Sequence, residues 1–418
     1  MMIVAAVLPL TASCRDIADE TLRVDYIFNG TAATCDISLS GMARWDGWDG
    51  RTVNMKDVPV AGNGEICMCD AQCGDTLYRS TFSTLFMEWQ ATPEAKTVRK
   101  AFENTFLLPM PPHSATVMVT LFDSRRNVSA TFSHPVDPDD ILIRRVARRQ
   151  IAAADPSCAT AEAAVPYASY IHRGGDPSEA IDIAIVAEGY TAEELPTFME
   201  DARTAVDAMF SHEPYASLRD RLNFLAVAPA SKDSGVSVPR DGLWMDTPVA
   251  SHFDTFYSAR YLTTEAVFRL HDLLEGLPYE HIIILANTDV YGGGGIYNSY
   301  TLTTAHHAKF RPVVVHEFGH SFGALADEYA YSGDEDPYYF PDVEPWEQNI
   351  TTQADFASKW QDMMDVEGVG LFEGAGYQPV GVWRPAEDCR MRTNEAEAFC
   401  PVCQRAIARM IDFYTREK

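Results

Sequence analysis

The segment Pro312-Val313-Val314-Val315-His316-Glu317-Phe318-Gly319-His320 joins an apolar run to the pattern His-Glu-x-x-His. On a helix, residues four apart lie one turn apart on nearly the same face, so His316 and His320 can bind one Zn²⁺. Glu317 then projects to the side, where its carboxylate can take a proton from water and pass it to a leaving amine. The pattern predicts a metal helix with one catalytic Zn²⁺, and Glu317 as the catalytic base of a hydrolase.

A third metal ligand is expected soon after this helix, because catalytic zinc sites usually have three protein ligands. Asp327 is the closest candidate, but in an unbroken helix it would lie about 10 Å beyond His320 along the axis. The chain must therefore turn, and Gly323 can adopt the left-handed conformation that ends a helix. The spacing resembles the metzincin pattern HExxHxxGxx(H/D), except that Ala326 stands where that pattern has its third ligand. The alternative third ligands are Glu328 and Glu335.

Length and charge bound the class of protein. A chain of 418 residues with 46% hydrophobic residues is long for one core and predicts two domains. Its net charge of −27 argues against binding to nucleic acid or to an anionic membrane surface. No stretch of the sequence reaches the roughly 20 consecutive apolar residues of a transmembrane helix.

The N-terminus has the features of an export signal. Residues 1–13 form an apolar run that ends in small residues, and Cys14 follows directly. This resembles a short bacterial lipoprotein signal, with Cys14 as the lipidated residue, although a basic segment before the apolar run is missing. We therefore expect residues 1–20 to be a leader and tether of an exported protein. A cell-surface lipoprotein is expected, or a periplasmic or secreted protein, and its only contact with a membrane would be the lipid anchor.

The remaining eight cysteines permit disulfides in an exported protein, but their pairing cannot be deduced from the sequence. Two clusters could each be half of a zinc ribbon, because closely spaced cysteines are typical of such sites. Neither cluster has a well-placed second pair in the sequence. The clusters are Cys67, Cys69 and Cys73, and the pair Cys400 and Cys403.

The periodicity of the sequence predicts an α+β protein with two domains. Residues 21–145 contain alternating, β-rich segments such as 22–28 and 115–122, which predict an antiparallel β-sandwich with a turn at Asn29-Gly30. This part contains no cluster of ligands or nucleophiles, so a supporting or binding role is expected for it. Residues 146–175 are interpreted as a linker. Residues 176–418 alternate strands and helices, with strands at 180–190, 222–228 and 281–286 and helices at 191–210 and 264–274, and predict an α/β metallopeptidase domain.

A glycine-rich stretch lies just before the metal helix, at residues 291–300. A phosphate-binding loop is disfavoured, because no Gly-Lys-Ser/Thr follows. An open strand fits better, since glycines allow another backbone to approach closely and zinc peptidases pair such a strand with substrate. A flexible loop is the alternative. The predicted substrate-binding residues are Gly294, Gly295, Ile296 and Tyr297.

Several stretches together resemble the bacterial immunoglobulin-A metallopeptidase family. In the C-terminal part these are residues 185–190, 233–237, 316–329, 387–393 and 399–403. In the N-terminal part, residues 103–109 and 126–130 resemble the β-domain that often accompanies this family. The resemblance implies a zinc endopeptidase with a metzincin-like helix, and it implies that Met391 belongs to a turn beneath the metal. Its substrates would be proteins or glycoproteins, with immunoglobulin A as one possibility.

The predicted function is therefore zinc-dependent hydrolysis of peptide bonds. A tyrosine or histidine is expected to stabilise the oxyanion, and the candidates by residue type are His306, His307, Tyr329 and Tyr377. Two other functions compete with this one. The first is an exported lipoprotein that binds glycoproteins and has a structural or vestigial metal site, which the intact Glu317 argues against. The second is hydrolysis of amides or esters in a non-peptide polymer.

Overall fold

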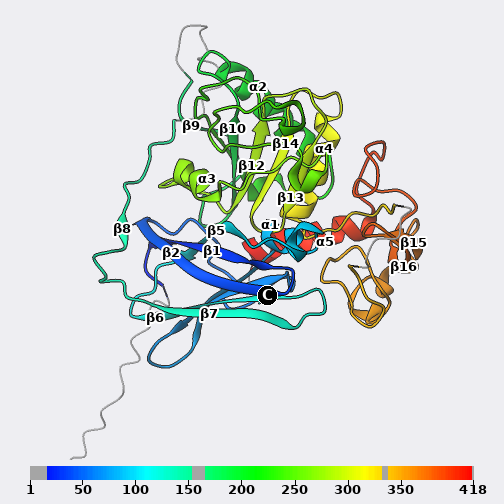
Figure 1. The fold of residues 1–418 in the computed structure, drawn as a ribbon, viewed down its shortest axis with the longest axis horizontal. Coiled ribbons are helices and arrows are strands. Elements are labelled where there is room, and N and C mark those ends of the chain that lie inside the picture. Colours follow the sequence, from blue (N-terminus) through cyan, green and yellow to red (C-terminus); the bar gives the residue numbers. More distant parts are fainter. Residues whose placement is uncertain (1–16, 153–164, 332–337, 417–418) are drawn as a thin grey trace, which may run out of the picture.

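The computed structural model describes residues 17–152, 165–331 and 338–416. Figure 1 shows two sheets from the N-terminal part of the chain below a larger sheet with helices, and a C-terminal segment at one side. This is the predicted α+β order, with β-sheets first and a mixed α/β sheet after them. Within the described residues, no helix is both long and apolar enough to cross a bilayer.

The N-terminal part consists of two four-stranded sheets, which are antiparallel apart from one short parallel pair, β2 with β8. Tyr26 of the first sheet contacts Phe132 and His134 of the second, so the two sheets share one apolar core. The first sheet has the order β5(Lys100–Pro109), β1(Glu20–Thr31), β2(Thr34–Asp46), β8(Arg144–Arg145). The second has the order β4(Thr76–Phe82), β3(Gly64–Asp70), β6(Ala115–Phe122), β7(Val128–Val136).

The predicted turn at Asn29-Gly30 is wrong. Both residues lie inside β1, paired with Asp36 and Cys35 of β2, and the chain reverses at Ala32 and Ala33 instead. Strand pairing continues past Gly30 because its missing side chain leaves room for the partner strand, whose Thr34 carbonyl would lie 1.9 Å from a Cβ.

The C-terminal part is built on a six-stranded mixed sheet. Its four central strands are parallel, and both edge strands, β13 and β9, run antiparallel to their neighbours. Every residue of β10 is buried, as expected for a parallel strand covered on both faces. The order is β13(Gly293–Ile296), β14(Tyr300–Thr304), β12(His281–Ala286), β10(Ile181–Glu188), β11(Leu222–Val227), β9(Ala168–Arg173). Edge strand β9 lies within the stretch interpreted as a linker, which is therefore partly structured.

Five α-helices accompany these sheets in the described residues. They are α1(Leu85–Gln90), α2(Leu195–Met209), α3(Val267–Leu274), α4(Phe310–Ser321) and α5(Pro401–Thr415). Helix α2 begins later than its pattern predicts, because residues 191–194 form a turn in which the Glu194 carboxylate accepts a hydrogen bond from the Thr191 N–H. The described part of the chain also has six short 3₁₀ helices, at Glu94–Lys96, Arg219–Arg221, Pro239–Asp241, Thr255–Tyr257, Phe356–Ser358 and Gln361–Met363. A two-stranded hairpin, β15(Phe372–Ala375) and β16(Gln378–Arg384), completes the fold.

The two parts share one hydrophobic core. Leu22 and Leu108 of the N-terminal sheets belong to the same apolar cluster as Leu270 and Leu302 of the C-terminal part. Figure 1 shows α1 and α5 between the N-terminal sheets and the mixed sheet. The N-terminal sheets are thus packed against the C-terminal part as a continuous structure, and not held to it by a linker alone.

A buried arginine adds an ionic contact to this interface. Arg23 of β1 is 1% exposed, and its guanidinium lies 2.6 Å from Asp272 and 2.9 Å from Glu275, both at the C-terminal end of α3 or beside it. It also donates a hydrogen bond to the Phe268 carbonyl. Such a charge is stable inside a protein only when paired and fully hydrogen-bonded.

We expect Arg23→Ala to lower the free energy of unfolding by about 3–5 kcal/mol, because it removes the buried cation that pairs with Asp25, Asp272 and Glu275 and leaves buried Glu275 with Arg144 alone. Urea unfolding followed by circular dichroism measures this change. The matched control is Arg99→Ala, which removes an exposed ion pair with Asp36 and should cost less than about 1 kcal/mol. Equal effects of the two substitutions would contradict an ionic role of Arg23 at the interface.

Candidate metal centre

The metal helix is present as α4, and it ends immediately after the His-Glu-x-x-His pattern, at Ser321. Gly323 is not the left-handed residue that we predicted; Ala324 is, with φ of 54°. Glycine is needed at 323 for a different reason, since a Cβ there would lie 2.7 Å from the Gly319 carbonyl oxygen. The chain therefore does turn after the helix, and this turn carries Asp327 back toward the histidines.

Three candidate ligand atoms converge at this place. Asp327 Oδ1 lies 3.0 Å from His316 Nε2 and 3.3 Å from His320 Nε2, and the two Nε2 atoms are 3.1 Å apart. Nitrogen and oxygen ligands about 2.0–2.1 Å from a tetrahedral ion lie about 3.3 Å from one another. The three atoms thus form a triangle of the size that one metal ion requires. His316, Glu317 and His320 also form a possible metal-binding group by proximity alone.

The other nitrogen of each histidine has a backbone partner. His316 Nδ1 lies 2.9 Å from the Arg390 carbonyl oxygen, and His320 Nδ1 lies 2.6 Å from the Leu325 carbonyl oxygen. A carbonyl can only accept, so each Nδ1 must carry the proton, and in the neutral ring Nε2 then has a free lone pair. Histidine ligands of metals are oriented in this way. The residues present therefore fit a bound metal ion.

The pKa values of the side chains at this site also support the interpretation that it binds a metal ion. Burial would raise the pKa of Asp327, but the nearby charge of His320 and hydrogen bonds from both histidines hold the pKa well below its usual range. Burial opposes the charge of His320, yet Asp327 raises the pKa of His320 to about 9. Asp327 therefore stays ionised, as a metal ligand must be. Burial raises the pKa of Glu317, which suits a carboxylate that gains and loses a proton.

The alternative third ligands lie elsewhere or cannot be placed. Glu328 is fully buried and points to a different group of side chains, where Asn349 Nδ2 and the Cys403 thiol donate hydrogen bonds to its Oε1. Asn349 also pairs with the backbone N–H and carbonyl of Ala326, which fixes the chain just before the two acids. Glu335 lies outside the described residues.

Tyr377 is the oxyanion candidate that the fold brings to the site. It lies in the turn between β15 and β16, it is 48% exposed, and its hydroxyl donates a hydrogen bond to Asp327 Oδ2. Tyr329 packs edge-on against the Tyr377 ring. The two histidine candidates have other partners: His306 pairs with Asp201 of α2, and the His307 ring packs against Tyr291.

The glycine-rich stretch forms the edge strand β13, which packs on α4. A Cβ at Gly293 would lie 2.8 Å from Glu317 Oε1, and one at Gly295 would lie 2.2 Å from the Glu317 carbonyl oxygen. Only glycine permits this approach. The outer edge of β13 is partly covered, since the backbone of Gly293 bonds to Arg260 and Leu262.

For two of the predicted substrate-binding residues, the structure does not support a contact of the side chain with substrate. Ile296 and Tyr297 are each only 2% exposed, and Tyr297 packs against Trp346 and bonds to Thr81 of the N-terminal part. Both residues are apolar or aromatic and fill the core where the two parts of the chain meet. Gly294 and Gly295 lie on β13, beside α4.

Met391 lies directly beneath α4. A Cβ at Gly319 would lie 2.7 Å from Met391 Sδ, so the methionine fills the space that this glycine leaves. Met391 is fully buried, and its carbonyl accepts a hydrogen bond from the Glu328 N–H at 2.8 Å. The turn that contains Met391 therefore supports both the helix and the segment that carries Asp327.

Sequence reasoning missed a contribution from the N-terminal part. Glu88 of α1 accepts a hydrogen bond from the Tyr261 hydroxyl, and Tyr261 packs against Gly294 of β13. Burial raises the pKa of Glu88 to about 7, and the charges of His320 and Asp327 also act on it. No local signal marks Glu88, because only the fold brings α1 near α4.

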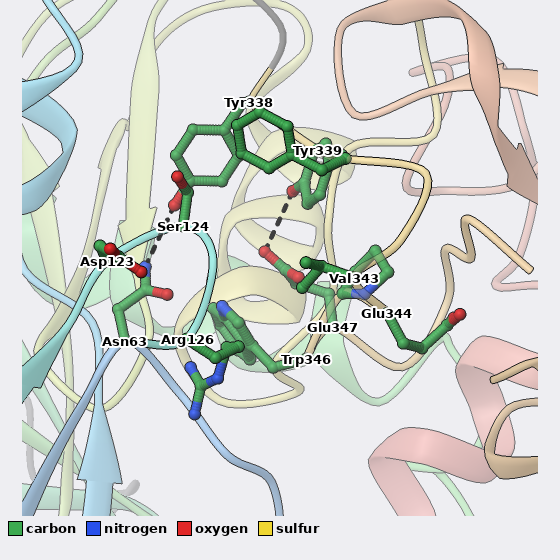
Figure 2. A pocket seen from close by; sticks show the side chains of 12 residues that line it. Asn63, Asp123, Ser124, Arg126, Tyr338, Tyr339, Val343, Glu344, Trp346 and Glu347 are labelled. Atoms are coloured by element: carbon green, nitrogen blue, oxygen red, sulfur yellow. Dashed lines mark hydrogen bonds between the residues drawn. The ribbon is translucent and has the colours of Figure 1, made fainter. Parts of the chain in front are cut away.

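One pocket of the molecule lies away from the metal ligands. Figure 2 shows it between N-terminal loops and residues 338–347, with hydrogen bonds from Asn63 to Tyr338 and from Tyr339 to Glu347. None of its lining residues belongs to the group around His316. This pocket belongs to the interface between the two parts of the chain.

Three features together are those of a metallopeptidase. They are a helix with the His-Glu-x-x-His pattern, an aspartate in contact with both histidines, and a mixed sheet beside the helix. The family described as IgA Peptidase M64 matches residues 170–368 and 364–411, and its N-terminal domain, Peptidase M64 N-terminus, matches residues 15–133. The first match covers more than half of the chain, so the chain belongs to the IgA peptidase M64 family. Membership implies metallo-endopeptidase activity and protein substrates. Comparison with curated proteins found no match.

Proposed function

We propose that this protein is a zinc-dependent endopeptidase whose centre consists of His316, His320 and Asp327, with Glu317 as the catalytic base. The observation that carries the proposal is the triangle of three ligand atoms, with separations of 3.0–3.3 Å, next to a glutamate on the same helix. A purely structural metal site has no need of that glutamate. The same observation argues against the alternative of a glycoprotein-binding protein with a structural or vestigial metal.

Each residue of the centre has a role in hydrolysis. Zn²⁺, when bound, supplies a Lewis acid that polarises the scissile carbonyl and lowers the pKa of water. Glu317 takes a proton on its carboxylate from the attacking water and then delivers it to the nitrogen of the leaving amine. The Tyr377 hydroxyl, which donates a hydrogen bond to Asp327, would donate it to the oxyanion of the substrate instead during hydrolysis.

The substrate backbone would lie along β13. Its glycines let the strand lie directly against α4, with Gly295 next to the Glu317 carbonyl, and Gly294 and Gly295 are the residues we assign to substrate binding. Arg260 and Leu262 hydrogen-bond to this edge of the strand at Gly293, so we place the substrate further along the edge, toward Gly295. The sheet edge beside a helix with two histidine ligands supports the metzincin-like arrangement as part of this proposal.

The proposed location is outside the cytoplasm. The apolar N-terminal run before Cys14 supports export and a lipid anchor, although these residues lie outside the described ones. An exported endopeptidase would meet host proteins, and the family name supports immunoglobulin A as a substrate to test. The net charge of −27 does not favour nucleic acid as a partner.

The test of the proposed function is cleavage of proteins by the purified full chain. Immunoglobulin A and a mixture of unfolded proteins are incubated with the protein, with the chelator-treated protein, and with the treated protein after zinc is restored. We expect internal cleavage that chelator removes and zinc restores, read as new N-termini by mass spectrometry. Zinc-loaded protein that cleaves no peptide bond in either sample would overturn the proposal, and cleavage of the mixture alone would limit it to other proteins.

Tyr377→Phe should lower kcat about 10- to 100-fold while metal content stays near that of the wild type, because the hydroxyl bonds to a ligand without being one. Peptide hydrolysis and metal analysis on the same preparation measure both quantities. Tyr331→Phe is the matched control, since its ring stacks on Tyr377 but its hydroxyl bonds to Arg260. An unchanged kcat for Tyr377→Phe would exclude the tyrosine from the chemistry.

A further inference from the structure

A second group of ligating side chains lies next to the catalytic centre, and the proposed mechanism does not use it. Glu328, Cys389, Cys400 and Cys403 are all buried, and their ligating atoms lie within 4.8 Å of one another. The sequence places Cys400 and Cys403 in a Cys-x-x-Cys pair at the start of α5, but it does not reveal the other two ligands. Folding supplies Cys389 from the turn before Met391, and Glu328 from the segment after α4.

The separation of two of the sulfurs fits a tetrahedral ion. Cys389 Sγ and Cys403 Sγ are 3.8 Å apart, and Cys403 Sγ lies 3.0 Å from Glu328 Oε1. Two thiolates at about 2.3 Å from a tetrahedral zinc ion lie about 3.8 Å from each other, whereas a disulfide brings the sulfurs to about 2.05 Å. Three cysteines and one carboxylate also form a complete set of four ligands.

The carboxylate of Glu328 points to a missing ligand. Its Oε1 accepts hydrogen bonds from Asn349 and Cys403, but its buried Oε2 has no hydrogen-bond partner. A buried carboxylate oxygen without a partner is costly. A disulfide between two of the cysteines would give neither this oxygen nor the third sulfur a new partner. A bound cation would be a partner for the carboxylate and for all three sulfurs.

The backbone at the start of α5 is arranged for thiolates. The Cys400 N–H lies 3.2 Å from Cys389 Sγ, and the Cys403 N–H lies 3.5 Å from Cys400 Sγ. Both N–H groups belong to the first turn or the cap of a 15-residue helix, where the helix dipole favours negative charge. The buried Arg384 guanidinium adds a positive charge that acts on Glu328.

We propose that Glu328, Cys389, Cys400 and Cys403 bind a second, structural zinc ion. This ion would join three segments that hold the catalytic centre. Glu328 is the neighbour of Asp327 in the chain, and its N–H bonds to the Met391 carbonyl. Cys389 is the neighbour of Arg390, whose carbonyl orients His316. The second zinc ion thus positions catalytic ligands without contact with substrate, and its presence does not depend on which substrate is cleaved.

The first test is the zinc content of the full chain, measured by elemental analysis after removal of loosely bound metal. We expect about two zinc ions per chain in the wild type and about one in the variant with both His316→Ala and His320→Ala. The Cys400→Ser variant should also retain about one zinc ion per chain. The matched control is Cys73→Ser, an exposed cysteine of the N-terminal part, which should retain about two. A zinc content of Cys400→Ser equal to that of the wild type would overturn the proposal.

The second test needs no cysteine variant and therefore does not depend on the folding of one. Cobalt bound by three thiolates gives an intense thiolate-to-metal absorption in the near ultraviolet, which a site of two histidines and an aspartate does not give. We expect this band in the cobalt-loaded wild type and in the variant without His316 and His320. Its absence from both, or a disulfide among the three cysteines in a non-reducing peptide map, would contradict the second site.

The other cysteine cluster shows no comparable geometry. Cys67 and Cys69 lie on β3 with their sulfurs 3.6 Å apart, and within the described ranges no group of three ligating side chains includes them. Cys73 is exposed. The alternative of half a zinc ribbon at these residues is therefore not supported, whereas Cys400 and Cys403 lie beside two further ligating side chains in the fold.

Discussion

Glu317→Gln is expected to reduce peptide hydrolysis about 10²- to 10⁴-fold while the catalytic metal stays bound, because the amide cannot accept the proton of the attacking water. Glutamine has nearly the same size as glutamate, so β13, whose Gly293 lies so close to this side chain that a Cβ there would be 2.8 Å from Glu317 Oε1, should not move. The measurement compares kcat and zinc content of the variant and the wild type, purified in the same way.

The control for this substitution is Glu200→Gln, which makes the same chemical change at an exposed position of α2. It should leave both kcat and zinc content unchanged. Near-full activity of Glu317→Gln would remove Glu317 from the mechanism. Loss of the metal on this substitution would instead make Glu317 a ligand, and the roles of Glu317 and Asp327 would need to be revised.

Asp327→Ala should weaken zinc binding at the catalytic centre by more than about 100-fold, which is the upper end of the effect for residues that only orient a ligand. Its Oδ1 lies within 3.3 Å of both Nε2 atoms, so its removal takes one of three ligands and the charge that balances the ion. His320→Ala should have an effect of similar size. Competition with a chelator of known affinity measures the change in each variant.

The matched control for Asp327→Ala is Asp362→Ala, which removes an exposed aspartate paired with Arg405. It should not change zinc affinity at either site. Wild-type affinity of Asp327→Ala at the catalytic centre would show that another residue is the third ligand. Glu335, which lies outside the described residues, would then be the next candidate.

Features with a local cause could be predicted from the sequence. The strands β10, β11 and β12 follow from apolar runs bounded by turns, and β12 has the predicted bounds of His281–Ala286. The metal helix follows from the spacing of His316 and His320, since two histidines one turn apart can share an ion. The resemblance to the IgA peptidase family rested on such short stretches, and the family match confirms it.

Features that depend on contacts between distant segments could not be predicted in this way. Ala324, and not Gly323, takes the left-handed conformation, and Gly323 is needed instead where the chain passes the Gly319 carbonyl. Tyr377 reaches Asp327 from a hairpin 50 residues later in the sequence. Cys389 and Glu328 join the Cys400 pair only when α5 packs against the segment after α4.

The relation between the two parts of the chain is a further example. The absence of ligand clusters in residues 21–145 predicts a part that is separate from the chemistry, whereas the hydrophobic core continues from one part into the other. Glu88 and Tyr261 connect α1 to the strand beside the catalytic helix. Burial of apolar surface between domains has no period in the sequence, so only the folded structure reveals it.

The most direct test of the catalytic centre is anomalous diffraction from crystals of the wild-type protein, with data collected on both sides of the zinc absorption edge. We expect an anomalous difference peak at about 2.0–2.2 Å from His316 Nε2, His320 Nε2 and one Asp327 oxygen. No peak between these three atoms in crystals grown with zinc, or a peak there without Asp327 among its ligands, would contradict the centre described here.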